Sequence, residues 1–289
     1  MILDVSHLRI EFSIEGRKSV PVRNVSFSIP EKGRIALVGE SGCGKSLTAL
    51  ALGGLVDRAK ISGTIVGRPR IAYVFQNPMQ SLNPVMRVGK QIEEGIPSAA
   101  QPSTITLQAL LAAVGLPADA ARKHPCELSG GQQQRVMIAM ALAQEPDLLI
   151  ADEPTTALDV TTQREVLDLI RRIADERGTA VLLITHNLGL VKRYTDYVNV
   201  MYAGEIVEHG PTAEILRNPR HPYTQGLVAA VPRLSAPKDA PLTDIPGTVP
   251  PPWNWPQGCA FHPRCPNFKP SCAAPDFNGL CPAVAGNRK

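Results

Sequence analysis

Two segments near the amino terminus alternate between apolar and polar residues. This period of two is typical of strands that bury one face of a sheet. The apolar positions are Leu8, Ile10, Phe12 and Ile14 in the first segment, and Val25, Phe27 and Ile29 in the second. We therefore predict an antiparallel sheet at the start of the protein.

Further along, short apolar runs alternate with longer segments of helical character. Residues 34–38, 147–151 and 179–185 are predicted to form buried strands, because each run is short and mostly apolar. Residues 47–55 and 160–177 are predicted to form helices. The alternation of strands with helices favours an α/β core with a mainly parallel sheet.

A small helical insert is predicted at about residues 77–135. Its apolar positions fit one face of an amphipathic helix: Ile105, Leu110, Leu111 and Val114.

The periodic pattern ends near residue 232. Of the 27 prolines, 13 lie between Pro232 and Pro282, and clustered prolines interrupt regular structure. We therefore predict an α/β domain at residues 1–232, which contains the helical insert, and an irregular proline-rich extension at residues 233–289 that carries four cysteines.

The composition is that of a globular protein. Hydrophobic residues make up 44% of the 289 residues, and the net charge of +4 is spread along the chain rather than gathered into basic blocks. Nucleic-acid binding is therefore not expected. The apolar runs fall far short of the ~20 residues of a membrane-spanning helix, and the first ten residues lack the pattern of an export signal. We expect any membrane role to depend on partner proteins.

The strongest chemical signal is the sequence at residues 39–46. It matches the phosphate-binding pattern GxxxxGK[ST] and lies between a predicted strand and a predicted helix. We expect Lys45 to reach the outer phosphates of ATP and Ser46 to bind Mg²⁺, while backbone N–H groups surround the phosphates. The expected nucleotide contacts are Gly39, Ser41, Gly42, Cys43, Gly44, Lys45 and Ser46.

Two carboxylates follow the predicted strand at residues 147–151. Asp152 and Glu153 would lie at its carboxyl end, where open α/β sheets bind their ligands. Asp152 suits the Mg²⁺ shell, and Glu153 could orient or deprotonate the water that attacks the γ-phosphate. Such a pair could also cap a helix, but the phosphate loop favours the catalytic interpretation.

A second helix start suited to phosphate lies at residues 128–135. Ser129, Gly130 and Gly131 precede a helix-like run, so they could cap that helix or present N–H groups to a phosphate. One nucleotide cannot easily use both helix starts within one subunit. We therefore expect this one to close on a nucleotide that a partner chain holds.

In order along the chain, these motifs resemble those of the ATPase subunits of ABC transporters. The resemblance covers residues 1 to about 232, and its elements are the phosphate loop, Gln76, the Leu-Ser-Gly-Gly-Gln sequence at 128–132, Asp152, Glu153, Asp159 and His186. It implies that two ATPase subunits enclose two ATP molecules between them. Ser129, Gly130 and Gly131 of one subunit would then face Lys45 and Glu153 of the other.

The same resemblance implies roles for residues that are weak signals alone. His186 would contact the γ-phosphate, although a histidine after a buried strand is more often structural. Gln76 would join Glu153 and His186 as a catalytic residue, contribute to the Mg²⁺ site and link it to transmembrane partners through the insert. Nucleotide contacts are also implied for Gln132 and Asp159, and Phe12 occupies the adenine-stacking position.

A narrower resemblance is to the oligopeptide, dipeptide and nickel importers. It rests on the sequences at residues 218–224, 245–247 and 258–266. It implies transport of peptides, nickel or a related small solute by two transmembrane permease subunits, a second ATPase subunit (a paralogue or a second copy) and an extracytoplasmic substrate-binding protein. The chain would then be a peripheral protein at the cytoplasmic face of the inner membrane.

Two other functions are alternatives. A soluble ABC-type ATPase that acts on DNA or ribosomes would need a long coiled-coil insertion, a zinc hook or tandem ATPase halves, and the sequence has none of these. A nucleotide switch without hydrolysis would be expected to have lost Glu153 or His186, and both are present.

Four of the six cysteines cluster in the extension, namely Cys259, Cys265, Cys272 and Cys281. In a reducing compartment, clustered cysteines more often hold metal than form disulfides. Four thiolates and the family resemblance favour a [4Fe-4S] cluster, with Zn²⁺ and then disulfides or free thiols as alternatives. We expect this centre to lie in a separate segment, so that ATP binding at Lys45 does not depend on it.

Overall fold

The structure is a computed structural model that describes residues 1–97, 105–156, 158–231, 244–274 and 281. The chain forms two compact units, each assembled from segments that are distant in sequence. Unit 1 consists of Met1–Leu3, Ile29–Arg34 and Gly67–Leu183, and unit 2 of the described residues within Asp4–Ser28, Ile35–Val66 and Ile184–Lys289. The extension after residue 243 therefore belongs to unit 2.

Unit 1 contains neighbouring strands in the order β7-β6-β5. Their bounds are β5 (Ile71–Val74), β6 (Leu148–Asp152) and β7 (Ala180–Thr185), whose last two residues belong to unit 2. Strands β5 and β6 run parallel, with Ile71 opposite Leu148 and Val74 opposite Ala151. The predicted strands at 147–151 and 179–185 are thus confirmed to within one residue at each end.

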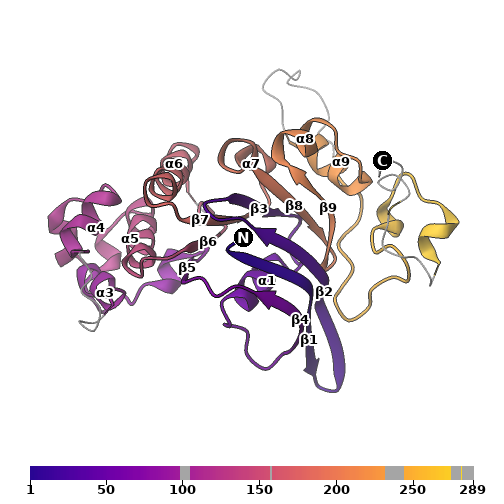
Figure 1. Ribbon diagram of the computed structural model, residues 1–289, viewed down its shortest axis with the longest axis horizontal. Helices are drawn as coiled ribbons and strands as arrows, with labels where there is room; N and C mark the ends of the chain where they lie inside the picture. The colour runs from indigo at the N-terminus through magenta and orange to yellow at the C-terminus, as the bar shows by residue number, and fades with distance from the viewer. Residues whose placement is uncertain (98–104, 157, 232–243, 275–280, 282–289) are drawn as a thin grey trace. The chain divides into compact units, whose positions relative to one another are not determined.

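The helices of unit 1 follow the predicted pattern. They are α2 (Pro78–Ser81), α3 (Val88–Glu94), α4 (Leu107–Ala113), η1 (Ala118–Arg122), η2 (Pro125–Glu127), α5 (Gly130–Ala143) and α6 (Val160–Arg177). Helices α3, α4 and α5 pack together (Figure 1). Leu110 and Leu111 of α4 are buried, which confirms the amphipathic helix that the sequence predicted in the insert.

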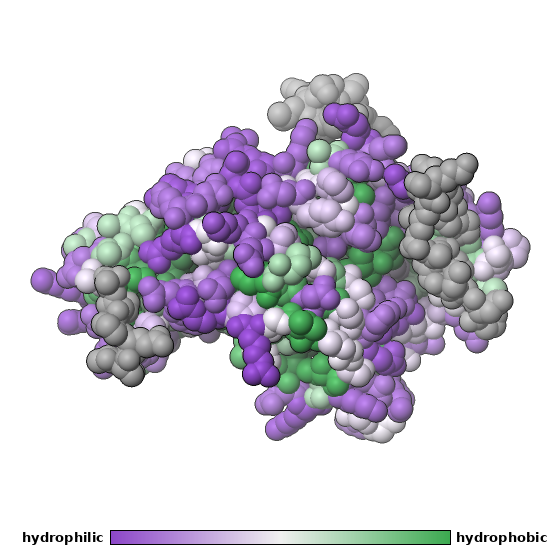
Figure 2. All heavy atoms as spheres, in the orientation of Figure 1, coloured by the Kyte–Doolittle hydropathy of each residue, from purple (hydrophilic) through white to green (hydrophobic). Residues whose placement is uncertain are grey.

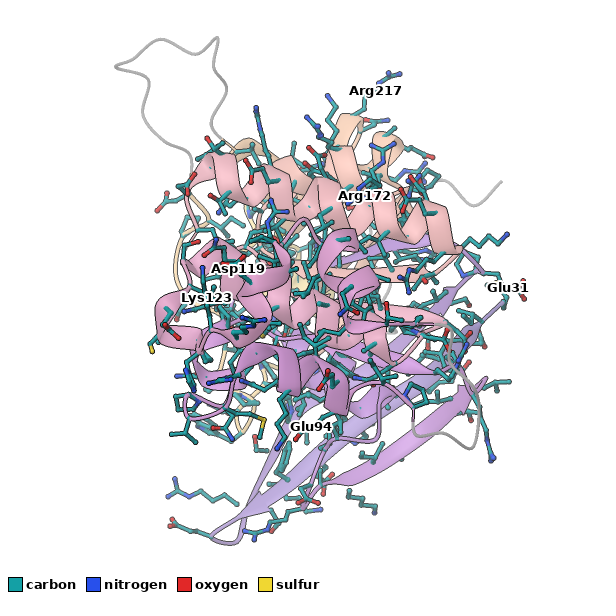
Figure 3. The ribbon with its side chains drawn as sticks, turned by 90° about the vertical axis from the view of Figure 1, so that its left-hand side faces the viewer. Glu31, Glu94, Asp119, Lys123, Arg172 and Arg217 are labelled. Carbon is teal, nitrogen blue, oxygen red and sulfur yellow. The ribbon has the colours of Figure 1, made fainter. Side chains whose placement is uncertain are left out.

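Polar side chains cover the outer face of α6 and the end of η1. Lys123 lies 3.5 Å from Asp119, where Figure 3 shows the two side chains close together on η1 and the residue after it. The surface over α6 is mostly hydrophilic (Figure 2), and its exposed Arg172 pairs with Glu176. Such exposed pairs contribute little to stability. Within the described ranges, no helix has the length and apolar content to cross a membrane.

Unit 2 contains a mixed sheet with the strand order β4-β1-β2-β9-β8-β3. The bounds are β1 (Leu3–Ile14), β2 (Arg17–Ile29), β3 (Arg34–Val38), β4 (Lys60–Val66), β8 (Tyr197–Tyr202) and β9 (Glu205–Pro211). β1 pairs antiparallel with β4, as does β8 with β9, whereas β3 and β8 are parallel. Alternate residues of β1 are buried from Leu3 to Ile10 except at an irregularity around His7, so the alternating pattern indicated a strand correctly.

The described part of the extension is irregular. Unit 2 also holds α1 (Lys45–Leu52), α7 (Leu188–Tyr194), α8 (Thr212–Arg217), α9 (Pro222–Ala229), η3 (His262–Arg264) and η4 (Pro270–Ala273). The Trp255 indole donates to the carbonyl of Val20 at 2.9 Å, and the guanidinium of Arg23 lies over the Trp255 ring. These contacts join the extension to β2. The predicted domain boundary at residue 232 falls outside the described residues and stays a prediction.

Candidate functional site

The phosphate loop has the predicted position between a strand and a helix. β3 leads into Gly39, and α1 begins at Lys45 with Gly44 as its N-cap. A Cβ on Gly39 would lie 2.1 Å from the carbonyl oxygen of Met201, so only glycine allows the loop to pass β8 this closely. Gly44 adopts φ +96°, a left-handed conformation that other residues rarely take. These two glycines therefore make the loop's closure possible.

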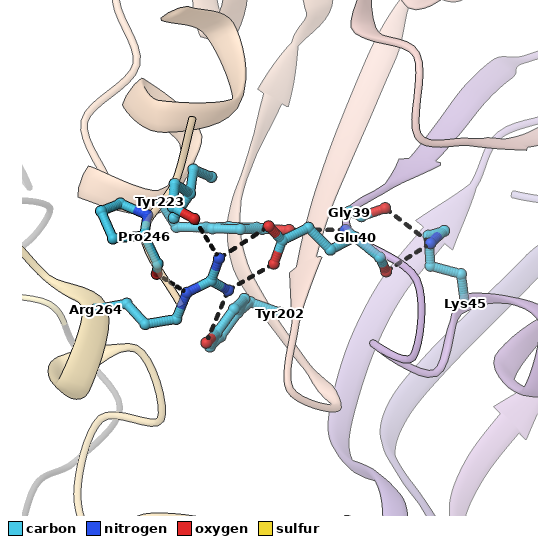
Figure 4. A network of polar contacts seen from close by, with 8 residues as sticks. Gly39, Glu40, Lys45, Tyr202, Tyr223, Pro246 and Arg264 are labelled. Atoms are coloured by element: carbon cyan, nitrogen blue, oxygen red, sulfur yellow. Dashed lines mark hydrogen bonds and ion pairs between the residues drawn. The ribbon is translucent and has the colours of Figure 1, made fainter. Parts of the chain in front are cut away.

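Lys45 lies within the curve of this loop. Its side chain is buried, and Nζ donates to the carbonyl oxygens of Gly39 at 2.8 Å and Glu40 at 2.9 Å (Figure 4). Ser46 is exposed in the first turn of α1. A glycine loop at the start of a helix, with an ammonium group beside it, has the donor groups that nucleotide phosphates require.

Two further residues with predicted nucleotide contacts are Phe12 and His186. Phe12 is half-buried on β1, and His186 is exposed directly after β7. Burial raises the pKa of the Cys43 thiol, which favours its neutral form. The roles of Phe12 and His186 stay predictions.

In unit 1, the register of the parallel strands brings Gln76 and Glu153 together. Each residue comes two positions after a paired residue, Val74 or Ala151. Gln76 Nε2 donates to Glu153 Oε2 at 3.2 Å, and the Thr156 hydroxyl donates to the same oxygen at 2.9 Å. The two donors fix the orientation of the carboxylate. Thr156 is a residue that the sequence analysis did not identify.

The backbone at Glu153 is strained. Its φ is +44°, in the left-handed region, where a residue other than glycine costs about 1–3 kcal/mol. A hydrogen bond from the Thr156 N–H to the Glu153 carbonyl closes the turn that holds this conformation. Strain of this kind is common where a side chain must point in a fixed direction for function. Asp152, the last residue of β6, precedes it and is half-buried.

The second predicted helix start is the N-terminus of α5. The Ser129 hydroxyl accepts from the Gln132 N–H at 3.3 Å, and the Gln132 side chain accepts from the Ser129 N–H at 3.0 Å. This reciprocal pair is a capping box. Ser129 and Gly130 are exposed. The start of α5 is therefore accessible to a ligand that a partner chain holds.

Asp159 has a defined structural role next to this helix start. Its carboxylate accepts from the N–H groups of Thr161 and Thr162 and from the Thr162 hydroxyl, and it thereby caps α6. The hydrogen bonds from Thr162 lower the pKa of Asp159. A Cβ on Gly131 would lie 2.6 Å from Thr162 Cγ2, so the starts of α5 and α6 meet at this threonine. The predicted contact of Asp159 with nucleotide stays a prediction.

The four cysteines of the extension share one cavity. Cys259, Cys265, Cys272 and Cys281 line a space of about 460 Å³, together with His221 and Phe261. They are free thiols, and burial, followed by the neighbouring cysteines, raises the pKa of Cys259 to about 11. Across the described residues, no group of three or more His, Cys, Asp or Glu is arranged to hold a metal ion. The predicted metal centre therefore stays a prediction.

The extension contacts the phosphate loop directly, and the expectation that ATP binding at Lys45 does not depend on the cysteine centre stays a prediction. Arg264, the last residue of η3, forms a bidentate ion pair with Glu40 of the loop, with N–O distances of 2.6 and 3.0 Å. Both residues belong to unit 2. The sequence contained both residues within motifs, but a separation of 224 positions gives no sign of the contact.

The phosphate loop, the carboxylates at the end of β6 and the α/β fold define a class of protein, the P-loop nucleoside triphosphatases. Residues 22–156 match the family model described as ABC transporter, and residues 207–272 match that of the oligopeptide/dipeptide transporter C-terminal region. The second match includes the described motifs around Tyr223 and Arg264.

Relatives and solved structures agree with this class. A Brucella abortus protein described as a peptide import ATP-binding protein is 43% identical over 95% of this chain and 90% of its own length. A Brucella melitensis protein of the same description is 45% identical over 94% and 91%.

A solved bacterial ABC transporter cassette, described as dimeric, superimposes with a TM-score of 0.63 at 25% identity, over 73% of this chain and 98% of its own. A subunit of a Clostridium perfringens ABC transporter complex has a TM-score of 0.64 at 26% identity, over 75% of this chain and 91% of its own. The chain belongs to the ATP-binding proteins of the ABC transporter family. It is an ATPase, and domains of this family bind ATP, usually with Mg²⁺.

The position of Glu153 generates a first prediction. We expect Glu153→Gln to leave ATP binding almost unchanged and to lower turnover by about 100-fold or more, because the phosphate contacts remain while activation of water is lost. Steady-state ATPase activity of the assembled transporter and the Kd of MgATP measure the two effects.

The matched control is Glu176→Gln, which makes the same chemical change at an exposed ion pair on α6. Its activity should equal that of the unsubstituted protein. A Glu153→Gln protein with turnover within a few-fold of the control would show that Glu153 is not the catalytic carboxylate.

Proposed function

We propose that the chain powers an importer of peptides by hydrolysing ATP at sites shared between two ATPase subunits. The observation that carries the proposed cargo is the similarity, over almost the whole chain, to proteins described as peptide import ATP-binding proteins. The match of the extension to the oligopeptide/dipeptide transporter region supports the same cargo. Nickel or another small solute is the alternative.

The geometry of unit 1 supports the shared sites. The start of α5 is exposed, capped and accessible, and a solved cassette similar to this chain is described as dimeric. Ser129, Gly130 and Gly131 of one subunit would complete the site around Lys45 and Glu153 of the other. Ser46, Gln76 and Asp152 are the proposed ligands of Mg²⁺, with His186 near the γ-phosphate and Phe12 on the adenine.

The shared-site proposal predicts a separation between binding and hydrolysis. Ser129→Arg should leave the Kd of MgATP for the isolated chain unchanged, because Ser129 would act on the nucleotide of the other subunit. Turnover of the assembled transporter should fall by about 100-fold, since a group that stabilises the transferred phosphoryl is lost. The isolated monomer should hydrolyse ATP poorly in either form.

Thr106→Arg is the matched control, because Thr106 caps α4 through the same kind of side-chain hydrogen bond. It separates the loss of a helix cap from the loss of a phosphate contact. If Ser129→Arg weakens MgATP binding to a chain that is shown to be monomeric, or if that monomer matches the transporter in turnover, hydrolysis does not need a second subunit.

The partners would be two transmembrane permease subunits, a second ATPase subunit and, indirectly, a substrate-binding protein. Exposed apolar residues close to Gln76 in the sequence support permease docking: Phe75 is 40% exposed, Met79 60% and Val85 84%. We refer to these three residues as the apolar group. Phe75 lies directly before the predicted coupling glutamine, and Met79 and Val85 follow it by three and nine residues, within the helical insert. The chain would then act as a peripheral protein at the cytoplasmic face of the membrane.

This apolar group also distinguishes the importer from a soluble ATPase that acts on DNA or ribosomes. Such an enzyme would need a basic surface rather than an apolar one for its partner. The helices of the insert are short in the described residues, and the coiled-coil arm that such enzymes carry would need a much longer insertion.

The proposed docking group leads to a prediction for transport. The double change Met79→Asp and Val85→Asp should abolish co-purification with permease subunits and uptake of a labelled tripeptide, while MgATP binding by the isolated chain stays unchanged. Val66→Asp is the control, because Val66 is as exposed as Met79, at 60%, but lies on β4. Retained uptake in the double variant would exclude this docking surface.

The cargo has a test of its own. Normal uptake of the labelled peptide by cells that carry the Glu153→Gln protein would exclude peptide as the cargo.

We also propose that Cys259, Cys265, Cys272 and Cys281 hold a [4Fe-4S] cluster, with Zn²⁺ as the alternative. The donor set fits, because four thiols line a common cavity and four thiolates are the ligand set of such a cluster. When bound, the group would supply a covalent link between segments of an extension that has little regular structure.

Metal analysis of anaerobically purified protein tests this assignment. We expect ~4 iron and ~4 acid-labile sulfide per chain, with both lost in Cys265→Ser and both retained in Cys126→Ser, which changes an exposed cysteine outside the cavity. Stoichiometric zinc without iron or sulfide would exclude the cluster in favour of zinc.

A further inference from the structure

We propose that Arg264 of the extension is a positioning residue for ATP binding, because it holds Glu40 and through it the phosphate loop that carries Lys45. The contact that carries this inference is the bidentate pair of Arg264 with Glu40 (Figure 4). Two parallel N–H···O bonds fix direction as well as distance.

The guanidinium of Arg264 has a partner for each of its donor groups. Nε donates to the Pro246 carbonyl at 2.7 Å, and Nη2 to that of Ile245 at 3.0 Å. Nη1 also lies 3.4 Å from the Tyr202 hydroxyl. With Glu40, these contacts account for all five N–H groups that an arginine carries. The Arg264 side chain is only 5% exposed, so it is a fixed part of unit 2.

Electrostatics keep this group charged in its buried position. Burial opposes the charge, but the hydrogen bonds and attraction from Glu40 and Tyr202 outweigh it and raise the pKa of Arg264. Cation–π contacts add to the fit, since the guanidinium carbon lies 5.8 Å from the Tyr202 ring centre and 5.9 Å from that of Phe261. Lysine could not reproduce this set of contacts.

Glu40 is held at its backbone as well as at its side chain. Its N–H donates to the Tyr223 hydroxyl at 2.8 Å, and Tyr223 is fully buried in α9. Its carbonyl oxygen accepts from Lys45 Nζ and lies 3.4 Å from the Cys43 N–H. The Glu40 N–H shares its peptide group with the Gly39 carbonyl, which also accepts from Lys45 Nζ. Tyr223 therefore orients a peptide group that directs Lys45, and Arg264 holds the side chain of the same glutamate.

Three segments that are separate in sequence meet around the ion pair of Arg264 with Glu40. Tyr223 belongs to the sequence at 218–224, the carbonyls of Ile245 and Pro246 to that at 245–247, and Arg264 to that at 258–266. An aromatic group joins them, because the rings of Tyr202, Tyr223 and Phe261 lie within 4.6 to 5.4 Å of one another. The extension is built around the phosphate loop.

Two physical effects follow for ATP. A loop that is already fixed loses less freedom when nucleotide binds, which favours affinity. Arg264 also neutralises the Glu40 carboxylate, whose negative charge would otherwise repel the phosphates from within the binding loop. Removing Arg264 should therefore weaken nucleotide binding through a freed loop and an unpaired carboxylate, while the catalytic groups of unit 1 stay intact.

Binding of MgATP to the full-length chain by calorimetry tests the inference. Arg264→Gln should raise the Kd about tenfold, within the range of coupling between neighbouring sites. In the assembled transporter, KM should rise by a similar factor with little change in kcat. Arg264→Lys should recover part of the affinity, since it restores the charge without the two parallel bonds.

The double variant Arg264→Gln with Glu40→Gln distinguishes positioning from a general structural role. It should bind MgATP more tightly than Arg264→Gln alone, because no unpaired carboxylate remains near the phosphates. Arg220→Gln is the matched control, since Arg220 forms an ion pair with Glu214 on the surface of the same unit, and it should bind MgATP normally.

A wild-type Kd and KM in Arg264→Gln, with only a lower unfolding temperature, would overturn the inference. The inference would also be overturned if the loss of MgATP binding free energy in the double variant equalled the sum of the losses in the two single variants. If Arg264→Gln does not fold, Arg264→Lys and Glu40→Gln decide: unchanged affinity in both would overturn the role, and weaker binding by Arg264→Lys, with its melting temperature unchanged, would support it.

Discussion

The close passage of the phosphate loop beside β8 is the constraint on which the rest of unit 2 depends. Gly39 comes so near to the Met201 carbonyl that a Cβ would overlap it at 2.1 Å. This approach brings the Glu40 N–H into hydrogen-bond distance of the Tyr223 hydroxyl. It also leaves the Lys45 ammonium group between two carbonyls of its own loop. A bulkier residue would move the loop away from β8 and separate these groups. The phosphate site is therefore a property of packing as much as of the motif.

Unit 1 contributes a second constraint, which is the register of β5 and β6. Because Val74 pairs with Ala151, the residues that follow both strands leave the sheet together, and Gln76 can reach Glu153. The left-handed backbone at Glu153 and the hydrogen bond from Thr156 then direct the carboxylate. A carboxylate that activates water, which is the role predicted for Glu153, needs this kind of fixed direction, because small errors in geometry cost much of its effect.

The extension is part of the ATP-binding unit rather than an appendage. A short turn, η3, has Arg264 at its end and Cys265 directly after it, so the ion pair with the phosphate loop and the cysteine cavity share a few residues of backbone. Phe261, just before this turn, packs against the tyrosines of β8 and α9. Buried aromatic contacts of this kind stabilise a segment that has little regular structure of its own.

The sequence by itself determined the local elements and the chemistry of the loop. The apolar run at 34–38 predicted β3, and the helical period at 160–177 predicted α6, both with the bounds that the structure shows. These predictions succeed because the period of apolar side chains is a property of neighbouring residues. The glycines around Lys45 indicated a phosphate loop for the same local reason. Only the tertiary structure decided that Thr156 and Gln76 share an oxygen of Glu153, and that Arg264 meets Glu40 across 224 positions. Such contacts depend on strand register and on how distant segments pack, and neither has a signature in the local pattern of residues.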